Sequence, residues 1–460
     1  MSADKAREFA QADRLLTRGE ADAAWAIVRK YLHDDPNDIP GLVMGGMVFE
    51  KAGNTVVAYH FFKKVTELQP NDANSWINFG RVAEDMWRTQ EAERAYYKGL
   101  KIANRDESKR LLYGNLSALC IDNGRYEEGE KHALKSLAIK DTTLARSNLG
   151  FCQLAQRNWA EGWKNYRHTI GNEWRKRVQY KGEPEWDGSP GKTVVLYGEQ
   201  GLGDEVSFAS MVPDALRICK KLILDVDPRL KALFQRSFPD AKVYGTRNAK
   251  PSDGLKWEKA DHDFDCSLAL GQIGEYFRTG DERFPGTPYL VADPDRVTMW
   301  KALFAIKKKP VIGLAWSGGI PKTGAKHRRF ELEQLQPLFD AVDAHWVNLQ
   351  YKPEDTKGFP VNTYHYATLT KDYDDTAALA ASCDLVICMQ TAVAHLGGAL
   401  GVPTWVFVPK ASQWRYGGEG DSIPWYKSLR VIRETKWDAD IKRTAEDLSA
   451  YFGKRPAKDA

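Results

Sequence analysis

The sequence lacks the features that mark several whole classes of protein. No run approaches the roughly 18 consecutive apolar residues of a membrane-spanning helix, and the opening MSADKAREFAQADRLL holds no apolar core of a signal peptide. No charge of one sign dominates, because the formal net charge is only +4 over 460 residues. That balance gives no electrostatic argument for binding nucleic acid or an acidic membrane surface.

Cysteine is scarce and unpatterned. The six cysteines form no CxxC pair, so we expect buried thiols in a reducing compartment and neither a disulfide framework nor a zinc site. With 43% hydrophobic and 28% charged residues, the chain is typical of a globular protein of two or three domains. We therefore expect a cytoplasmic location.

The first third of the chain repeats itself. Pro36 and Pro70 lie 34 residues apart and each begins the triplet PND. That period is typical of tetratricopeptide (TPR) units, each of which is a pair of antiparallel helices. Small residues that let the two helices of a unit pack closely recur at the same spacing, namely Gly46 and Gly80, and Ala58 and Ala92.

Two further units follow at 114–139 and 147–166. The spacing slips by about three residues between the third and fourth units, which predicts one longer loop there. We expect residues 1–172 to form an all-α TPR superhelix, because each unit must stack on its neighbours to bury its apolar face. Its groove is predicted either to bind a peptide or protein partner or to serve as a spacer or dimerisation module, and a homo-oligomer stays open.

Beyond a bridging segment at 173–192, the pattern changes to strands alternating with helices. We expect two Rossmann-like α/β halves, at 193–306 and 307–460, each built on a parallel sheet with a cleft between them. The fold class is therefore α + α/β. Buried strands are predicted at 194–198, 222–227, 311–316, 345–350, 384–389 and 404–409.

The stretch QTAVAHLGGAL follows one of these strands. A helix that begins near Thr391 directs free backbone N–H groups at its start, and such a helix end attracts anions. The Thr391 hydroxyl can also donate, and His395 lies one turn later on the same face. The alternative is that His395 is a core histidine bonded to a carbonyl group.

A second glycine-rich junction, GEQGLGD, follows the strand at 194–198. Asp204 either caps the following helix or faces the cleft as a general base that takes a proton from an acceptor hydroxyl. Its neighbours Glu199, Gln200, Gly201 and Gly203 are candidates for contacts with the acceptor.

A third loop, WSGGIPKTGAKHRRF, follows the strand at 311–316 and gathers cations between glycines. Lys322, Lys326 and Arg329 suit a phosphate group, with Gly318 allowing close approach. The alternative is a solvated basic loop. No DxD-type motif stands at a strand end in a convincing context, so we predict neither a metal nor a cofactor.

The C-terminal segment WRYGGEGDSIPWY is dense in aromatic residues, glycine and proline. Trp414, Arg415, Trp425 and Tyr426 are predicted either to line a pocket for the base or sugar of a ligand, or to clamp the C-terminal helix onto the first α/β half.

Four stretches together carry a family likeness, in the order 198–213, 313–319, 384–409 and 414–433. Behind TPR units, they resemble bacterial TPR-containing glycosyltransferases of GT-B fold. These are similar to ADP-heptose:lipopolysaccharide heptosyltransferases and more distantly to TPR-bearing O-GlcNAc transferases. The sequence departs from the family pattern at Gln390, where Asp is common, and at Phe330, where Ser is usual.

The resemblance implies a metal-independent transferase, inverting in its stereochemistry, that moves a sugar from a nucleotide-sugar to an acceptor hydroxyl. The second half would bind the donor diphosphate through Gln390, Thr391, Ala392, His395, Gly318 and the basic loop, and Asp204 on the first half would be the base. The acceptor would be a protein, a peptide or a saccharide. Rival hypotheses are a binding protein with a degenerate transferase module, a nucleotide-sugar epimerase, and a transferase that acts on modified DNA.

Overall fold

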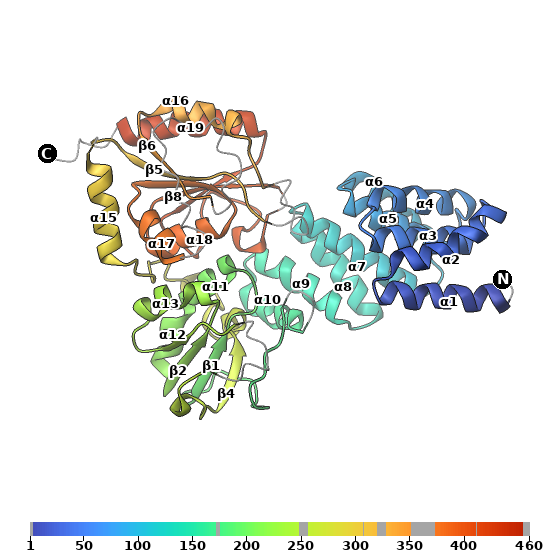
Figure 1. The fold of residues 1–460 in the computed structure, drawn as a ribbon, viewed down its shortest axis with the longest axis horizontal. Helices are drawn as coiled ribbons and strands as arrows, with labels where there is room; N and C mark the ends of the chain where they lie inside the picture. Colours follow the sequence, from blue (N-terminus) through green and yellow to red (C-terminus); the bar gives the residue numbers. More distant parts are fainter. Residues whose placement is uncertain are drawn as a thin grey trace. The chain divides into compact units, whose positions relative to one another are not determined.

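The computed structural model describes residues 3–171, 175–247, 256–306, 308–319, 328–350, 373–410 and 412–453. The chain divides into two compact units, Met1–Leu149 and Gly150–Ala460. The first unit is helical and the second contains both parallel sheets (Figure 1). None of the helices in the described ranges is long and apolar enough to cross a membrane.

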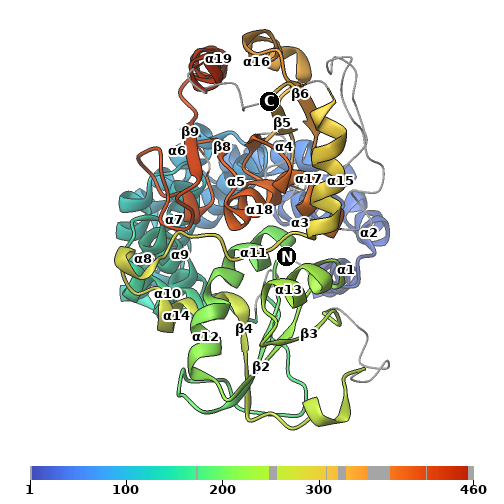
Figure 2. The ribbon, with the colours of Figure 1, turned by 90° about the vertical axis from the view of Figure 1, so that its left-hand side faces the viewer.

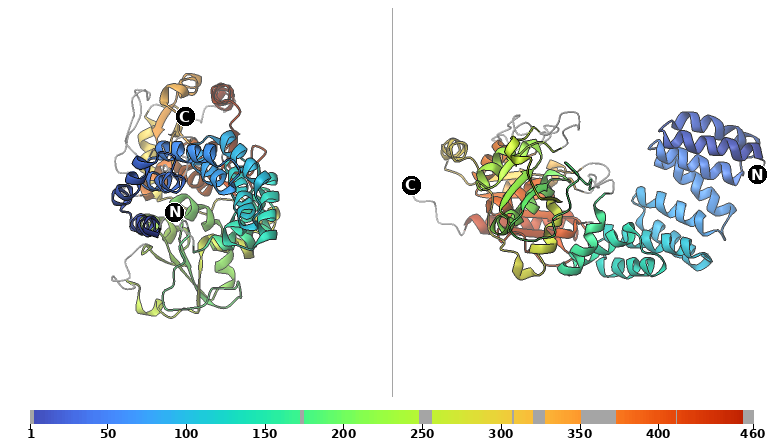
Figure 3. Two further views of the ribbon diagram at one scale, coloured as in Figure 1. Left: turned by 90° about the vertical axis from the view of Figure 1, so that its right-hand side faces the viewer. Right: turned by 90° about the horizontal axis from the view of Figure 1, so that it is seen from below.

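The first unit is a series of helical hairpins of the TPR type. Consecutive helices pack in pairs, α1 with α2, α3 with α4, α5 with α6 and α7 with α8, and each hairpin stacks on the next (Figure 3). Their bounds are α1 Ala3–Thr17, α2 Ala21–Asp34, α3 Ile39–Lys51, α4 Thr55–Leu68, α5 Ala73–Asp85, α6 Thr89–Ile102, α7 Asp106–Asp122 and α8 Tyr126–Ile139, before α9 Thr143–Ala155.

The 34-residue period has a direct structural cause. A Cβ atom added at Gly46 would lie 2.6 Å from the ring of Phe62, and one added at Gly80 would lie 2.4 Å from the ring of Tyr96. Gly80 follows Gly46 by 34 residues, and Tyr96 follows Phe62 by the same number. Glycine on the first helix and an aromatic ring on the second thus form the same close contact in successive hairpins, which confirms the predicted repeat.

The predicted longer loop is wrong, because the extra residues extend a helix instead. Helix α7 has 17 residues, whereas its counterpart α5 has 13. Gly114 continues the 34-residue series of Gly46 and Gly80, so the insertion follows this glycine and lengthens the C-terminal end of α7. A helix absorbs three residues there as nearly one additional turn.

The first sheet of the second unit consists of β1 Thr193–Tyr197, β2 Lys221–Asp225, β3 Lys242–Tyr244 and β4 Cys266–Ala269. All neighbouring pairs are parallel, in the order β3-β2-β1-β4. Figure 2 shows this sheet beside its short helices, which are α11 Leu202–Phe208, α12 Val212–Ile218, α13 Lys231–Ser237 and α14 Gly274–Phe277. The strands are almost wholly buried, as expected for a parallel sheet between helices.

The second sheet consists of β5 Val311–Ala315, β6 His345–Asn348, β7 Leu385–Met389, β8 Thr404–Val408 and β9 Leu429–Arg433. Its order is β6-β5-β7-β8-β9 and it is parallel throughout. In Figure 1, α16 Gln336–Ala341 and α19 Trp437–Gly453 lie over one face, while α17 Tyr373–Ala381 and α18 Ala392–Leu400 lie on the other. Helix α15 Pro294–Ala305 packs beside α17.

Each sheet has one place where the strand order reverses direction. In the first sheet, β2 and β3 follow one another outward on one side of β1, and β4 lies on its other side. In the second sheet, β6 lies on one side of β5, and β7, β8 and β9 follow outward on the other side. Ligands of open α/β sheets bind outside the carboxyl ends of the strands at such a switch point. The fold therefore selects the loops that follow β1, β4, β5 and β7.

Candidate functional site

The loop after β7 forms as the sequence predicts. Strand β7 ends at Met389 and α18 begins at Ala392, with the Thr391 hydroxyl as the N-cap that accepts a hydrogen bond from the Val393 N–H at 3.3 Å. At the other end, Gly401 adopts φ 76°, a left-handed conformation that closes the helix. A strand, a polar N-cap and a C-terminal glycine thus fix the position of Thr391 at a sheet switch point.

The glycines inside α18 serve packing. A Cβ atom at Gly397 would lie 2.3 Å from the Thr404 hydroxyl of β8, and one at Gly398 would lie 2.4 Å from the ring of Tyr426. These glycines therefore let α18 lie close to its own sheet and to the aromatic C-terminal segment. They leave the start of the helix, at Thr391 and Ala392, as the part that a ligand could approach.

Gly318, in the loop after β5, lies directly on this helix start. A Cβ atom there would be 2.3 Å from Thr391 Cγ2, and the Gly318 N–H donates to the Arg328 carbonyl oxygen at 3.1 Å. The structure thus brings together Gly318 and Thr391, two of the predicted donor residues, at the β5–β7 switch point.

Gln390 is buried directly before the N-cap, with 1% of its surface exposed. Neither its amide nitrogen nor its amide oxygen has a hydrogen-bond partner among the described residues. The buried Tyr416 hydroxyl, whose ring lies 5.7 Å from the His395 ring, is likewise without a partner in that part of the chain. Buried polar groups are normally paired, and an unpaired one costs about 1–3 kcal/mol. Both groups are thus free to hydrogen-bond to a partner that the described residues do not supply.

His395 is a core residue of this structure. Only 3% of it is exposed, and its Nδ1 atom lies 3.2 Å from the Tyr426 hydroxyl, which in turn lies 3.4 Å from the Tyr289 hydroxyl. Burial, together with the positive charge of Arg415, lowers the pKa of His395 to about 3. The imidazole is therefore neutral near pH 7, so it can hydrogen-bond to a diphosphate but adds no positive charge to it.

The loop after β1 reaches the same helix from the other lobe. A Cβ atom at Gly203 would lie 3.0 Å from Ala392 Cα and 3.3 Å from His395 Cδ2. Helix α11 therefore packs against the first turn of α18, and a larger residue at Gly203 would push the two helices slightly apart. The two glycine-rich junctions, far apart in the sequence, therefore lie side by side.

Asp204 occupies the first turn of α11. Its Oδ2 atom accepts the Gly201 N–H at 3.0 Å, and its Oδ1 atom forms an ion pair with Arg415 Nη2 at 2.8 Å. The side chain keeps 22% exposure, whereas that of Arg415 keeps 2%. The capping contact predicted for Asp204 is present, and its role as a general base stays a prediction. A carboxylate has further lone pairs, so both roles are compatible.

The acceptor-side candidates next to Asp204 are engaged with the chain itself. Glu199 forms a buried ion pair with Arg175, with 2.7 Å between Oε1 and Nη2. Gln200 donates to the Tyr166 hydroxyl at 2.9 Å, and the Arg175 guanidinium lies over the Tyr166 ring at 4.2 Å. These contacts hold the β1 loop in place, so Glu199 and Gln200 are positioned to shape the site.

Of the basic loop, the structure describes residues 316–319 and 328–330. Lys322 and Lys326 lie outside the described residues. Arg329 forms an ion pair with Glu331, with 3.1 Å between Nε and Oε1. The backbone of Arg329 forms an isolated antiparallel β-bridge with that of Ser317. The Arg329 side chain is 43% exposed. The predicted phosphate contact of this arginine stays a prediction.

Phe330, one of the departures from the family pattern, belongs to the hydrophobic core. It is 2% exposed and its ring lies 5.1 Å from Phe407 and 5.0 Å from Trp437. The Phe330 ring therefore adds apolar packing under α19.

The C-terminal segment clamps the two lobes of the second unit together. Trp414 packs in an aromatic cluster with Trp163, Tyr166, Phe208 and Trp425, and the Arg415 guanidinium lies over the rings of Phe208 and Trp414. These contacts hold the segment itself against the first lobe, whereas the C-terminal helix α19 packs against α16 of the second. The two roles considered from the sequence, a ligand pocket and a clamp on the C-terminal helix, stay predictions. The partner of Arg415 could not be found from the sequence, because an ion pair between distant segments leaves no periodic signal.

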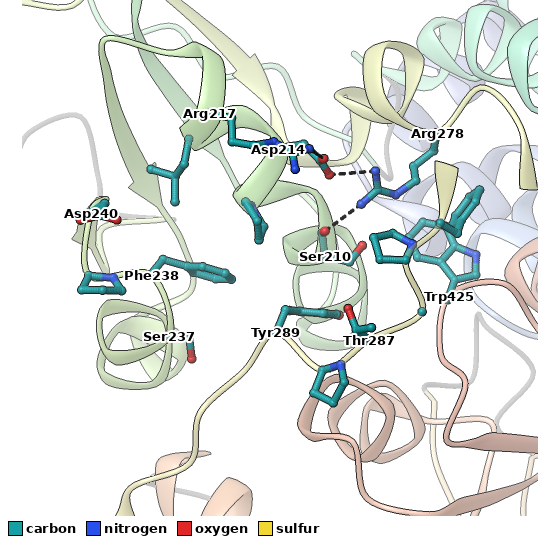
Figure 4. Close-up of a pocket in the computed structure, with 17 residues that line it drawn as sticks. Ser210, Asp214, Arg217, Ser237, Phe238, Asp240, Arg278, Thr287, Tyr289 and Trp425 are labelled. Atoms are coloured by element: carbon teal, nitrogen blue, oxygen red, sulfur yellow. Dashed lines mark hydrogen bonds and ion pairs between the residues drawn. The ribbon is translucent and has the colours of Figure 1, made fainter. Parts of the chain in front are cut away.

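The second unit also has an open cavity of about 370 Å³, drawn in Figure 4. Arg278 lies at its edge, paired with Asp214, and the ring of Trp425 lies beside it. Of the residues singled out from the sequence, Trp425 lines this cavity, whereas Asp204, Thr391 and His395 do not. Tyr289 lines the cavity, and its hydroxyl lies 3.4 Å from that of Tyr426 beside the site.

No protein-family model matches the chain. The sequence is similar to Protein FlbA of Caulobacter vibrioides, with 28% identity over 449 residues, which is 90% of this chain and 74% of FlbA. At this identity FlbA is a distant relative, and the likeness assigns no family.

Among solved structures, MamA has 21% identity and a TM-score of 0.31, covering 34% of this chain and 91% of MamA. Pseudomonas aeruginosa PilF has 16% identity and a TM-score of 0.33, covering 36% of this chain and 74% of PilF. The type IV pilus biogenesis factor PilW has 14% identity and a TM-score of 0.34, covering 36% of this chain and 77% of PilW. These likenesses say nothing about the chemistry of the site.

Proposed function

We propose that this protein is a glycosyltransferase of GT-B type that moves a sugar from a nucleotide-sugar to an acceptor hydroxyl. The observation that supports it best is the contact of Gly203 with Ala392 and His395, because it joins the two predicted half-sites at the switch points of two parallel sheets. The family resemblance of the four sequence stretches gives the reaction class.

In this proposal the donor diphosphate lies at the start of α18. The backbone N–H groups there and the Thr391 hydroxyl face the charge that grows on the leaving diphosphate, and Arg329 with the rest of the basic loop adds positive charge. The Gln390 amide, which has no hydrogen-bond partner in the described part of the chain, contacts the donor. The neutral His395 orients Tyr426 and the helix start.

Asp204 acts from the other lobe. Arg415 and the Gly201 N–H hold its carboxylate in one orientation, and a remaining lone pair takes the proton of the acceptor hydroxyl as that oxygen attacks the anomeric carbon. The bond from this carbon to the diphosphate oxygen breaks as the new glycosidic bond forms. Attack from the face opposite the leaving group inverts the configuration.

The experiment separates binding from chemistry. The purified protein is screened by thermal shift against UDP, GDP, ADP, CMP and TDP, and any nucleotide that raises the melting temperature is then tested as its sugar conjugate for release of free nucleotide. Asp204→Asn should keep the thermal shift and lower the turnover at least about 100-fold. Asp240→Asn, which changes an exposed carboxylate in the same lobe, should leave both readouts unchanged. Full turnover by folded Asp204→Asn would remove the base assignment.

A second candidate function is a binding protein whose transferase module has lost its chemistry. The observation in its favour is that Asp204 and His395 are both engaged by other side chains, Arg415 and Tyr426 respectively. The helical hairpins would then bind a protein partner. Absence of any nucleotide-induced shift at millimolar concentrations would favour this candidate.

A further inference from the structure

The helical hairpin α7–α8 brings three potential metal ligands together. Cys120 lies near the end of α7, while Glu128 and His132 lie four residues apart on one face of α8. One ligand atom from each of the three lies within 4.8 Å of the other two. Cys120 is fully buried and His132 is 6% exposed. We call these residues the Cys120–Glu128–His132 cluster.

The spacing inside this cluster is unusual for a hydrogen-bond network. His132 Nε2 lies 3.7 Å from Glu128 Oε1, and the Tyr97 hydroxyl lies 3.3 Å from Glu128 Oε1 and 3.4 Å from His132 Nε2. Good hydrogen bonds between such atoms are shorter, at about 2.7–3.0 Å. In contrast, ligands at about 2.1 Å from a tetrahedral metal ion stand about 3.4 Å apart.

A second observation also points to a ligand. His132 Nδ1 is buried and has no hydrogen-bond partner among the described residues. A buried ring nitrogen normally has a partner. The other ring nitrogen, Nε2, lies 3.4 Å from the Tyr97 hydroxyl and 3.7 Å from Glu128 Oε1, so the described residues give neither ring nitrogen a short hydrogen bond.

The surroundings favour one geometry of the glutamate. Arg125 Nη1 lies 3.0 Å from Glu128 Oε2 and 2.7 Å from Glu93 Oε1. The arginine therefore occupies one oxygen of Glu128 and leaves the other turned toward His132, and Glu93 offsets its positive charge. Metal-binding carboxylates are commonly held by such an outer partner.

We propose that the Cys120–Glu128–His132 cluster binds a zinc ion. Sulfur, nitrogen and oxygen from three side chains are a donor set typical of Zn²⁺, with a fourth position open to water or to the Tyr97 hydroxyl. On binding, the Cys120 thiol gives up its proton to solvent and coordinates as the thiolate. The ion would link α7 to α8 and stiffen the middle of the repeat unit. CxxC spacing does not reveal this cluster, because its members come together only when the hairpin forms.

The test uses the full-length protein and Co²⁺, which reports tetrahedral thiolate coordination by its absorption. Titration should give a sulfur-to-cobalt charge-transfer band together with visible d–d bands, saturating at one ion per chain, and Zn²⁺ should remove both. Cys120→Ser should abolish the charge-transfer band. Cys152→Ser is the matched control, since it removes another fully buried thiol and should leave the band unchanged.

Each result decides the proposal. A folded wild-type protein without the charge-transfer band, or a band that survives Cys120→Ser, would overturn it. If Cys120→Ser does not fold, His132→Gln replaces it, because the thiol is then intact and the affinity for Co²⁺ should fall at least about tenfold. An unchanged affinity in His132→Gln would also overturn the proposal.

Discussion

Arg415 forms an ion pair with Asp204 across the two lobes of the second unit, with 2.8 Å between Nη2 and Oδ1. The two residues are 211 positions apart in the sequence. The arginine is buried between aromatic rings, while the aspartate keeps a path to solvent. One contact thus joins the lobes, orients the predicted base and anchors the C-terminal segment.

Arg415→Met should therefore destabilise the second unit. Methionine keeps much of the apolar packing on Phe208 and Trp414, so the loss is chiefly that of the ion pair. We expect a decrease of about 1–3 kcal/mol in the free energy of unfolding, since Asp204 is only partly buried and water can reach it. Urea denaturation of both proteins measures this difference. Arg415→Met as stable as the wild type would show that the ion pair adds nothing to the lobe contact.

Gly203→Ala should disturb the same lobe contact from the other side. The added methyl group would lie 3.0 Å from Ala392 Cα, so the backbones of α11 and α18 must separate. We expect a loss of about 1–3 kcal/mol of stability and weaker nucleotide binding, measured by urea denaturation and thermal shift.

Gly453→Ala is the matched control for this substitution, because a Cβ atom there has nothing within 4 Å. It should leave stability and binding unchanged. A Gly203→Ala protein that matches this control in both measurements would show that the two helices need not touch.

The sequence was most informative where local chemistry decides the structure. The β7–α18 junction is bounded by an apolar run, a capping threonine and a helix-ending glycine, and all three act within a few residues. The 34-residue repeat was equally readable, because Gly46 and Gly80 each meet one aromatic ring, that of Phe62 and of Tyr96. Strand β9 was not predicted, since the glycines and aromatic residues before Leu429 hid a short alternating strand.

The sequence could not give the partners of the site residues. His395 and Tyr426 meet because α18 and the C-terminal segment pack together, and Asp204 meets Arg415 for the same reason. The same holds for the buried amide of Gln390, whose lack of partners depends on the surrounding fold. Such contacts between distant segments follow from tertiary packing, which no periodicity in the sequence records.

The buried His395 should make stability depend on pH. Its pKa is lowered from 6.5 to about 3 in the folded state, so the unfolded chain binds a proton that the folded chain does not bind between these values. The stabilisation is complete above about pH 6.5 and is lost progressively as the pH falls toward 3.

We expect the wild type to lose on the order of 1 kcal/mol more than His395→Gln between pH 7.5 and pH 5.5. Urea denaturation of both proteins at the two pH values gives the loss of stability of each. Subtracting the loss of the variant from that of the wild type removes the contributions of the other histidines, which both proteins share. Equal losses in both proteins would show that His395 titrates normally and is not buried.

Gln390→Met distinguishes a ligand-binding amide from a structural one. Methionine has a similar shape and no hydrogen-bonding amide, so a side chain whose amide has no partner in the described structure should be replaced at no cost or with a gain of about 1 kcal/mol. Binding of the nucleotide-sugar, however, should weaken at least about tenfold, because an amide that contacts the donor is gone. Urea denaturation and isothermal calorimetry measure the two effects. A loss of stability above 1 kcal/mol with unchanged donor affinity would mean that the Gln390 amide supports the fold and does not contact the donor.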